Sequence, residues 1–153
     1  MKTRVDSIMK RTVRTCTPRD TLNVPAQVMW EVDCGCVPVV EGKRVVGIVT
    51  DRDICMAAYV RGKPLSQLTV DDTMAKHVFT CRPDDDLMDT ERVMQEHQVR
   101  RLPVVDDNGQ LVGLVSLADI ASRRDRDVSL TDLAATLQAV CRPREQPLMR
   151  TAH

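Results

Sequence analysis

Aromatic side chains are nearly absent: the 153 residues include one Trp, one Tyr and one Phe. Proteins that bind single-stranded nucleic acid stack its bases on several aromatic rings, and this chain has too few to build such a platform. An excess of one charge sign is missing as well, because 22 Lys and Arg balance 22 Asp and Glu. Without a net positive field, we expect neither nucleic acid nor an anionic membrane surface as a partner.

Long apolar runs are also lacking. No stretch approaches the roughly 20 apolar residues of a membrane-spanning helix, and Met1 to Arg4 lead into polar sequence rather than an apolar signal core. We therefore expect a soluble, cytoplasmic protein with no membrane partner, whose six cysteines are reduced thiols and not a disulfide scaffold. The length and the 42% hydrophobic content suit one compact unit or two halves that share a core.

The chain contains an internal duplication. Aligning residues 5–40 with 70–105, and 45–54 with 111–120, gives 20 identities in 46 positions. This is too many for chance, and a repeat must be recognised before the fold is assigned. The Gly62-Lys63-Pro64 segment is the natural link between the two halves.

Both halves predict the same order of elements, which is strand, helix, strand, strand, helix. Apolar runs flank the turn at Asp106–Gly109, where Asn and Gly accept positive φ, so a β-hairpin is expected there and at its counterpart in the first half. The remaining expected strands are stopped by prolines, which cannot donate to a strand ladder. The expected short strands are 13–16 and 78–81, and the expected helices are 22–32, 54–61, 87–97 and 120–126.

Each hairpin is followed by a hydroxyl and a carboxylate with capping-box spacing, Thr50 with Asp53 and Ser116 with Asp119. A carboxylate can accept two hydroxyl protons at once, which suits a ribose diol, while helix amides can meet a phosphate. The alternative is that these residues only cap helices, which contributes about 1 kcal/mol each to the fold. The two roles are compatible, because a capping carboxylate has a second oxygen.

The motif Gly-h-h-[Thr/Ser]-x-x-Asp-h, where h is apolar, occurs at residues 47–54 and 113–120 after Pro-Val-Val strands. This pattern resembles the CBS (cystathionine-β-synthase) domain in tandem, over about residues 3–124, as in stand-alone bacterial CBS-pair proteins of the hypoxic-response type. The resemblance implies an α/β (α+β) fold, in which two β-α-β-β-α repeats, residues 3–62 and 66–125, pack as a pseudo-twofold pair.

A last helix is expected at residues 129–142, with an apolar stripe of Leu130, Leu133, Ala134, Leu137 and Val140. This stripe could cover the module or make a dimer contact, and we expect by default that it covers the module. Residues 143–153 are expected to be a disordered tail.

The resemblance also implies two clefts between the repeats, where adenosine-containing ligands bind in many family members. The ligand would be AMP, ADP or ATP, and the assembly a homodimer that acts on an unknown regulated protein. One cleft would combine Ser116 and Asp119 with Thr15, Cys16, Val37 and Pro38. The other would combine Thr50 and Asp53 with Thr80, Cys81, Leu102 and Pro103.

The two clefts are not equivalent in sequence. The second repeat has Arg100 and Arg101 where the first has Gly35 and Cys36. Guanidinium groups suit phosphate oxygens, so the Ser116/Asp119 cleft is predicted to hold the nucleotide. The alternative is that the arginines pair with surface acids such as Asp106, where an ion pair contributes little.

Other functions were weighed against ligand sensing. Cys34 and Cys36 form a C-x-C pair near the strand of Cys16, which suggests a thiol or metal sensor. No histidine has zinc-ligand spacing to these cysteines, so buried inert thiols are favoured. An interaction scaffold with empty clefts is a third possibility. No nucleophile elbow, Walker sequence or histidine beside a candidate nucleophile is present, so we expect no enzyme activity.

Overall fold

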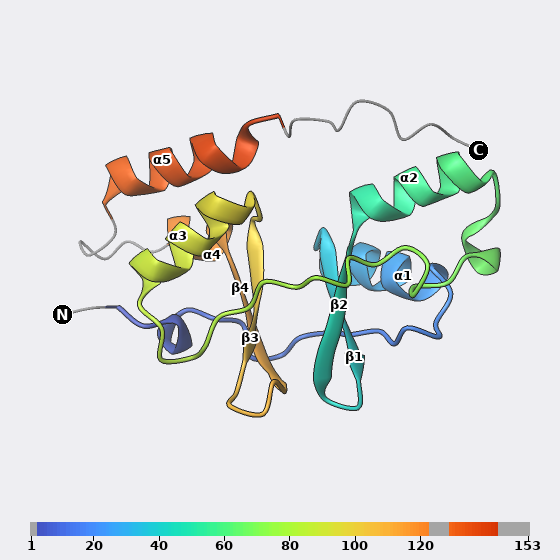
Figure 1. Ribbon diagram of the computed structural model, residues 1–153, viewed down its shortest axis with the longest axis horizontal. Coiled ribbons are helices and arrows are strands. Elements are labelled where there is room, and N and C mark those ends of the chain that lie inside the picture. The colour runs from blue at the N-terminus through green and yellow to red at the C-terminus, as the bar shows by residue number, and fades with distance from the viewer. Residues whose placement is uncertain (1–2, 123–128, 144–153) are drawn as a thin grey trace.

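A computed structural model describes residues 3–122 and 129–143. Two hairpins stand side by side, with the helices of each repeat grouped at the end away from the hairpin turns (Figure 1). Strands β1 and β2 pair with each other, as do β3 and β4. The elements in order are η1 (Val5–Ser7), α1 (Asn23–Val32), β1 (Cys36–Glu41), β2 (Arg44–Thr50), α2 (Asp51–Arg61), η2 (Leu65–Gln67), α3 (Leu87–His97), β3 (Arg101–Val105), β4 (Leu111–Ser116), α4 (Leu117–Ala121) and α5 (Leu130–Cys141).

Both predicted hairpins are confirmed. The β3–β4 register runs from Arg101 opposite Ser116 to Val105 opposite Leu111, and β1–β2 repeats this antiparallel arrangement. The second turn closes when the Gly109 amide donates to the Asp106 carbonyl at 3.0 Å. Gly109 has φ +74°, a left-handed conformation that glycine adopts without a steric cost.

The strands predicted at residues 13–16 and 78–81 are reduced to one bridging residue each. The Cys16 amide donates to the Pro38 carbonyl at 3.2 Å, and Cys81 forms the equivalent parallel bridge in the second repeat. A proline stands two residues after each cysteine and has no amide to extend the ladder. The mixed α/β class is confirmed, and each of the two sheets consists of the two hairpin strands.

The long helices lie where the sequence places them. Helix α3 has the predicted bounds, and α1 begins one residue later than expected. Helices α2 and α4 begin directly after Thr50 and Ser116, as the capping-box spacing predicts, and thus three residues before the expected spans at 54–61 and 120–126. The predicted continuation of α4 to residue 126 and the tail at 144–153 lie outside the described residues. Within the described ranges, no helix is both long and apolar enough to cross a membrane.

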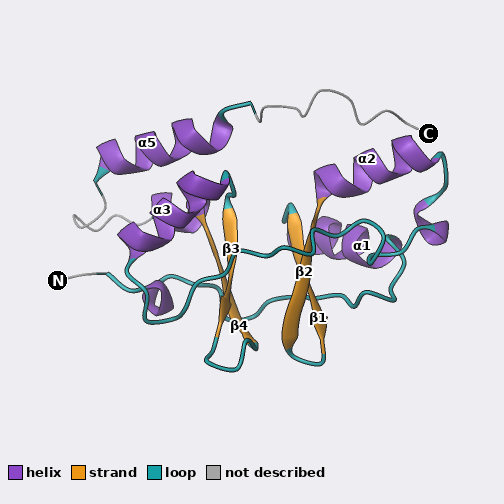
Figure 2. Cartoon of the chain, viewed as in Figure 1, coloured by secondary structure: helices purple, strands orange, loops and turns teal. Residues whose placement is uncertain are grey.

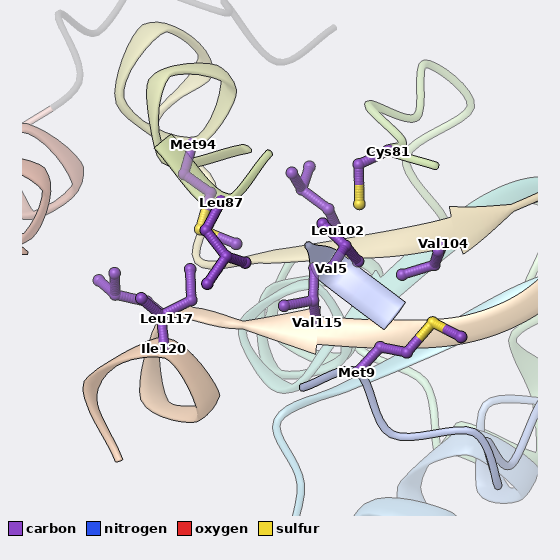
Figure 3. Packing of buried hydrophobic residues seen from close by; sticks show 10 residues of the cluster. All are labelled: Val5, Met9, Cys81, Leu87, Met94, Leu102, Val104, Val115, Leu117 and Ile120. Carbon is purple, nitrogen blue, oxygen red and sulfur yellow. The ribbon is translucent and has the colours of Figure 1, made fainter. Parts of the chain in front are cut away.

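Each repeat completes the core of the other. Val5 and Met9, from the first repeat, pack into a core otherwise built from the second (Figure 3). In the same way, Leu68 and Val70 belong to the core of the first repeat. Val5 and Val70 are fully buried. The lead segments of the two repeats are therefore exchanged, and neither core is whole without both halves of the chain.

Helix α5 covers the module, as expected by default, by packing along α3 (Figure 2). Gln95 Nε2 donates to Thr136 Oγ1 at 2.6 Å, and Thr136 and Val140 are buried. The predicted apolar stripe is wrong in part, since Leu130 and Leu137 are exposed. The helix turns its Thr136 and Val140 side toward α3, so those leucines face outward.

Candidate functional site

The Ser116/Asp119 pair forms a complete capping box. The amide and the hydroxyl of Ser116 both donate to Asp119 Oδ2, the amide at 2.9 Å, and the Asp119 amide donates to Ser116 Oγ at 3.1 Å. One carboxylate oxygen is thereby occupied, and Oδ1 is left to face other groups. The helix-capping role predicted from the spacing is confirmed.

The Thr50/Asp53 pair repeats this geometry at the start of α2. Thr50 donates to Asp53 Oδ2 from its amide at 2.9 Å and from its hydroxyl at 2.7 Å. Within the residues that the structure describes, Asp53 Oδ1 has no hydrogen bond or ion pair. Both aspartates are half-buried, and the capping hydrogen bonds of each use Oδ2 and leave Oδ1 for other contacts.

Asp119 has a basic neighbour that the sequence analysis did not identify. Lys10 Nζ lies 3.6 Å from Asp119 Oδ1, and Lys10 comes from the exchanged lead segment of the first repeat. The amides of Lys10 and Leu114 each donate to the other residue's carbonyl at 2.9 Å, which fixes this segment beside β4. The equivalent position in the second repeat is Ala75, so the two capping carboxylates differ in this neighbour.

Most of the residues predicted to line the clefts from the opposite repeat are buried. Thr15 is half-buried and Thr80 exposed. Within the described residues, no hydrogen bond joins either capping carboxylate to these positions. The buried set is Cys16, Val37, Pro38, Cys81, Leu102 and Pro103. A ligand placed against these strands would contact their backbone and the two threonines.

The two arginines of the second repeat point in different directions. Arg100 Nη2 donates to the thiol sulfur of Cys141 on α5, at 3.7 Å. Arg101 reaches toward the first repeat, because a Cβ built on Gly35 would lie 3.4 Å from Arg101 Nη2. The alternative pairing with Asp106 is not formed, since that carboxylate accepts hydrogen bonds from the amides of its own turn. Of the pair, only Arg101 lies between the repeats.

The buried cysteines are poor nucleophiles. Burial raises the pKa of Cys16 and of Cys81 to about 12, and the pKa of Cys36 to about 11 although Arg101 opposes that shift. A thiol with such a pKa stays protonated at neutral pH, whereas the thiolate is the reactive and metal-binding form. The Cys34 thiol donates to the Cys36 carbonyl at 3.3 Å. No cluster of three His, Cys, Asp or Glu side chains suited to a metal occurs in the described ranges.

Comparison with known proteins gives a consistent result for both repeats. The family model of the CBS domain matches residues 5–59 and 70–126. The CBS domain-containing protein YhcV of Bacillus subtilis is 37% identical over 117 residues, which cover 76% of this chain and 82% of that protein.

Solved structures agree with the sequence matches. The CBS domain pair of protein MJ0100, in complex with 5′-methylthioadenosine and S-adenosyl-L-methionine, superposes with a TM-score of 0.72 at 25% identity, covering 79% of this chain and 94% of that chain. Hypoxic Response Protein I, with two coordinated zinc ions, superposes with a TM-score of 0.73 at 32% identity, covering 80% of this chain and all of that one.

Proposed function

The chain belongs to the CBS-domain family, and from this premise we propose that it is a regulatory module without enzyme activity that binds an adenosine-containing ligand of the AMP, ADP or ATP class. The observation that carries the proposal is the pair of capping carboxylates, Asp53 and Asp119, each of which uses one oxygen for its helix and presents the other. A carboxylate oxygen placed in this way accepts hydrogen bonds from a ribose diol.

The Asp119 side of the module is the better candidate for a nucleotide. Arg101 comes from the second repeat, and its guanidinium faces the first repeat, where Arg101 Nη2 and Asp51 Oδ2 lie 3.4 and 3.3 Å from the Cβ position of Gly35. A guanidinium between the repeats suits a phosphate. The complex of MJ0100 with two adenosine compounds supports this class of ligand. Burial raises the pKa of Cys16 and of Cys81, so these thiols stay protonated and are poor nucleophiles. Binding rather than turnover is therefore the proposed activity, exerted in the cytoplasm on a regulated protein.

A thermal-shift panel tests the proposal. AMP, ADP, ATP, S-adenosylmethionine, NAD and zinc are each added to the full chain, with and without reductant. A ligand at 100 times its Kd stabilises by about 2.7 kcal/mol, which raises the Tm by several degrees in a chain of this length. No shift with any nucleoside at millimolar concentration contradicts the proposal. A shift with zinc or oxidant alone indicates the thiol or metal sensor, in line with the zinc ions of Hypoxic Response Protein I.

We also propose that the module works as a homodimer. In the second repeat, α5 packs along α3, whereas the equivalent helix α1 has no such cover among the described residues. Trp30 on α1 is 89% exposed, and Tyr59 and Val60 on α2 are 81% and 71% exposed. These side chains lie on two helices that contact each other. Exposed apolar side chains are typical of an interaction surface, and a second copy would cover them.

A further inference from the structure

The Lys10–Asp119 ion pair joins an exposed side chain to a half-buried one. The Lys10 side chain is 70% exposed, while that of Asp119 is 17% exposed and is held by the hydrogen bonds of its capping box. The ammonium lies 3.6 Å from Oδ1, the oxygen that capping leaves open. A ligand that donates to this oxygen therefore comes into contact with the Lys10 ammonium.

The duplication supplies an internal control for the role of this lysine. At the other capping box, Ala75 takes the place of Lys10, and Asp53 keeps the same cap geometry. The backbone bridge that positions the lead segment is also kept, because the Ala75 amide donates to the Ile48 carbonyl at 2.9 Å. Neither the cap nor the segment exchange depends on a lysine, so its presence at one carboxylate alone calls for another role.

Resting on the proposed function, we propose that Lys10 is a charge selector for the Asp119 cleft. A diol that donates to Oδ1 competes with the ammonium for that oxygen and weakens the ion pair, although the carboxylate keeps its charge. An adenosine compound with a phosphate offers the ammonium a second anion, because the flexible stem of lysine can bring the ammonium to it. A neutral nucleoside weakens the ion pair without offering another anion, and a cationic one repels the ammonium. The Asp119 cleft therefore selects phosphate-bearing adenosine compounds, while the Asp53 cleft, with Ala75, does not discriminate.

The test is titration calorimetry with AMP and adenosine on full-length variants. Asp53→Ala limits binding to the Asp119 cleft, and Lys10→Met is then added, which removes the charge and keeps most of the stem. We expect the ratio of AMP to adenosine affinity to fall on the order of tenfold, with adenosine bound at least as tightly as before. In the reciprocal arm, Asp119→Ala limits binding to the Asp53 cleft, and Ala75→Lys should raise the same ratio.

Each result decides between the proposals. A ratio unchanged by Lys10→Met, with binding retained, overturns the selector and leaves the proposed function standing. Binding by the wild type that disappears in Asp53→Ala places the ligand at the other cleft and also overturns the selector. If the wild type binds no adenosine compound, both proposals fail. The Tm of Lys10→Met without ligand should match that of the wild type, which excludes loss of folding as the cause of a changed ratio.

Discussion

Gly113 lies directly against Met9 of the other repeat: a Cβ built on this glycine would lie 2.7 Å from Met9 Sδ and 3.0 Å from the Lys10 carbonyl oxygen. Gly47 has the same relationship to Met74, and its Cβ would lie 3.2 Å from the Ala75 carbonyl. The glycine of each motif is thus the position at which the exchanged lead segment crosses a hairpin strand. Space for that segment, and not a positive φ, is what requires glycine there.

Gly113→Ala should destabilise the fold by about 1–3 kcal/mol, the usual cost of overpacking a close contact that includes backbone. Gly35→Ala is the matched control, because its nearest neighbours are the flexible ends of Asp51 and Arg101, at 3.3 and 3.4 Å. Urea denaturation of both variants measures the difference. Equal midpoints would show that the lead segment can shift without cost.

The contact between Gly113 and the lead segment of the other repeat could not be predicted from the sequence. The repeat alignment and the hairpin turns are local patterns, and they predicted the order of the hairpins and long helices and both ends of α3. The exchange of Val5 and Val70 between the cores joins residues far apart in the chain, and no local periodicity reports it. The outward position of Leu137 has a similar cause, since the face that α5 buries is set by α3 and not by its own apolar content.

In the candidate site as well, the sequence predicted local contacts but not contacts between distant parts of the chain. The spacing of Ser116 and Asp119 predicted the capping geometry. At the start of a helix, side chains three positions apart in this way can each bond the backbone amide of the other residue. Lys10 was missed since its proximity to Asp119 follows from the segment exchange. Arg100 and Arg101 are adjacent in the chain, and their opposite directions depend on where α5 and the first repeat pack.

Glu91 on α3 should make the stability depend on pH. Its side chain is buried, Oε1 has no hydrogen-bond partner, and burial followed by the nearby Asp132 raises its pKa. A carboxyl whose pKa is raised on folding stabilises the protein fully below its unfolded pKa of about 4.5, and this contribution is lost as the pH rises.

Glu91→Gln should therefore raise the Tm by a few degrees at pH 7, which corresponds to roughly 1 kcal/mol, and should have little effect at pH 4. Thermal unfolding followed by circular dichroism at both pH values checks this. The control is Glu96→Gln, an exposed position on the same helix. An equal change in Tm at pH 4 and pH 7 would mean that charge burial is not the cause.

The cysteines should fall into two reactivity classes. At pH 8, iodoacetamide should modify the exposed Cys55 and Cys141 first, while Cys16, Cys36 and Cys81 stay unmodified until urea is added. The raised pKa values of the buried thiols, about 11 to 12, keep them protonated. Mass spectrometry of timed samples counts the modified sites. Rapid modification of Cys36 in the folded protein would revive the thiol-sensor interpretation.

The same pKa shifts predict weaker folding in alkali. The pKa of a buried thiol rises from 9.0 in the unfolded chain to about 12 for Cys81, so the unfolded state loses its proton first. Stability from this group is complete below pH 9 and declines as the pH rises toward 12. Serine does not ionise in that range. Cys81→Ser should therefore reduce the slope of the Tm against pH above 9.

The homodimer should form through the exposed surface of α1 and α2. Trp30→Glu places a charge where an apolar side chain would be covered, so this variant should elute as a monomer at micromolar concentration while the wild type elutes as a dimer. Leu130→Glu on α5 is matched in exposure, 81% against 89%, and should remain dimeric. Light scattering coupled to size exclusion gives the masses. A monomeric wild type at all concentrations would rule out the dimer.

The asymmetry between the clefts should appear in nucleotide affinity. Asp119→Ala removes the acceptor for the ribose diol, and Arg101→Ala removes a cation near the phosphate, so each should weaken AMP binding by about 1.5–3 kcal/mol. Asp53→Ala should weaken AMP binding by clearly less than either of these variants. All three variants should fold, because a capping carboxylate or a lone arginine contributes only about 1 kcal/mol or less to stability.

Ser116→Ala is the control for the link between capping and binding. This variant keeps the carboxylate but removes the hydroxyl that donates to Asp119 Oδ2 and accepts from the Asp119 amide. It should therefore lower the Tm and the affinity together, whereas Arg101→Ala should lower the affinity alone. Titration calorimetry with parallel melting curves separates the two effects. If Asp53→Ala abolishes AMP binding while Asp119→Ala leaves it intact, the nucleotide occupies the Asp53 cleft, and Arg101 belongs to the surface between the repeats.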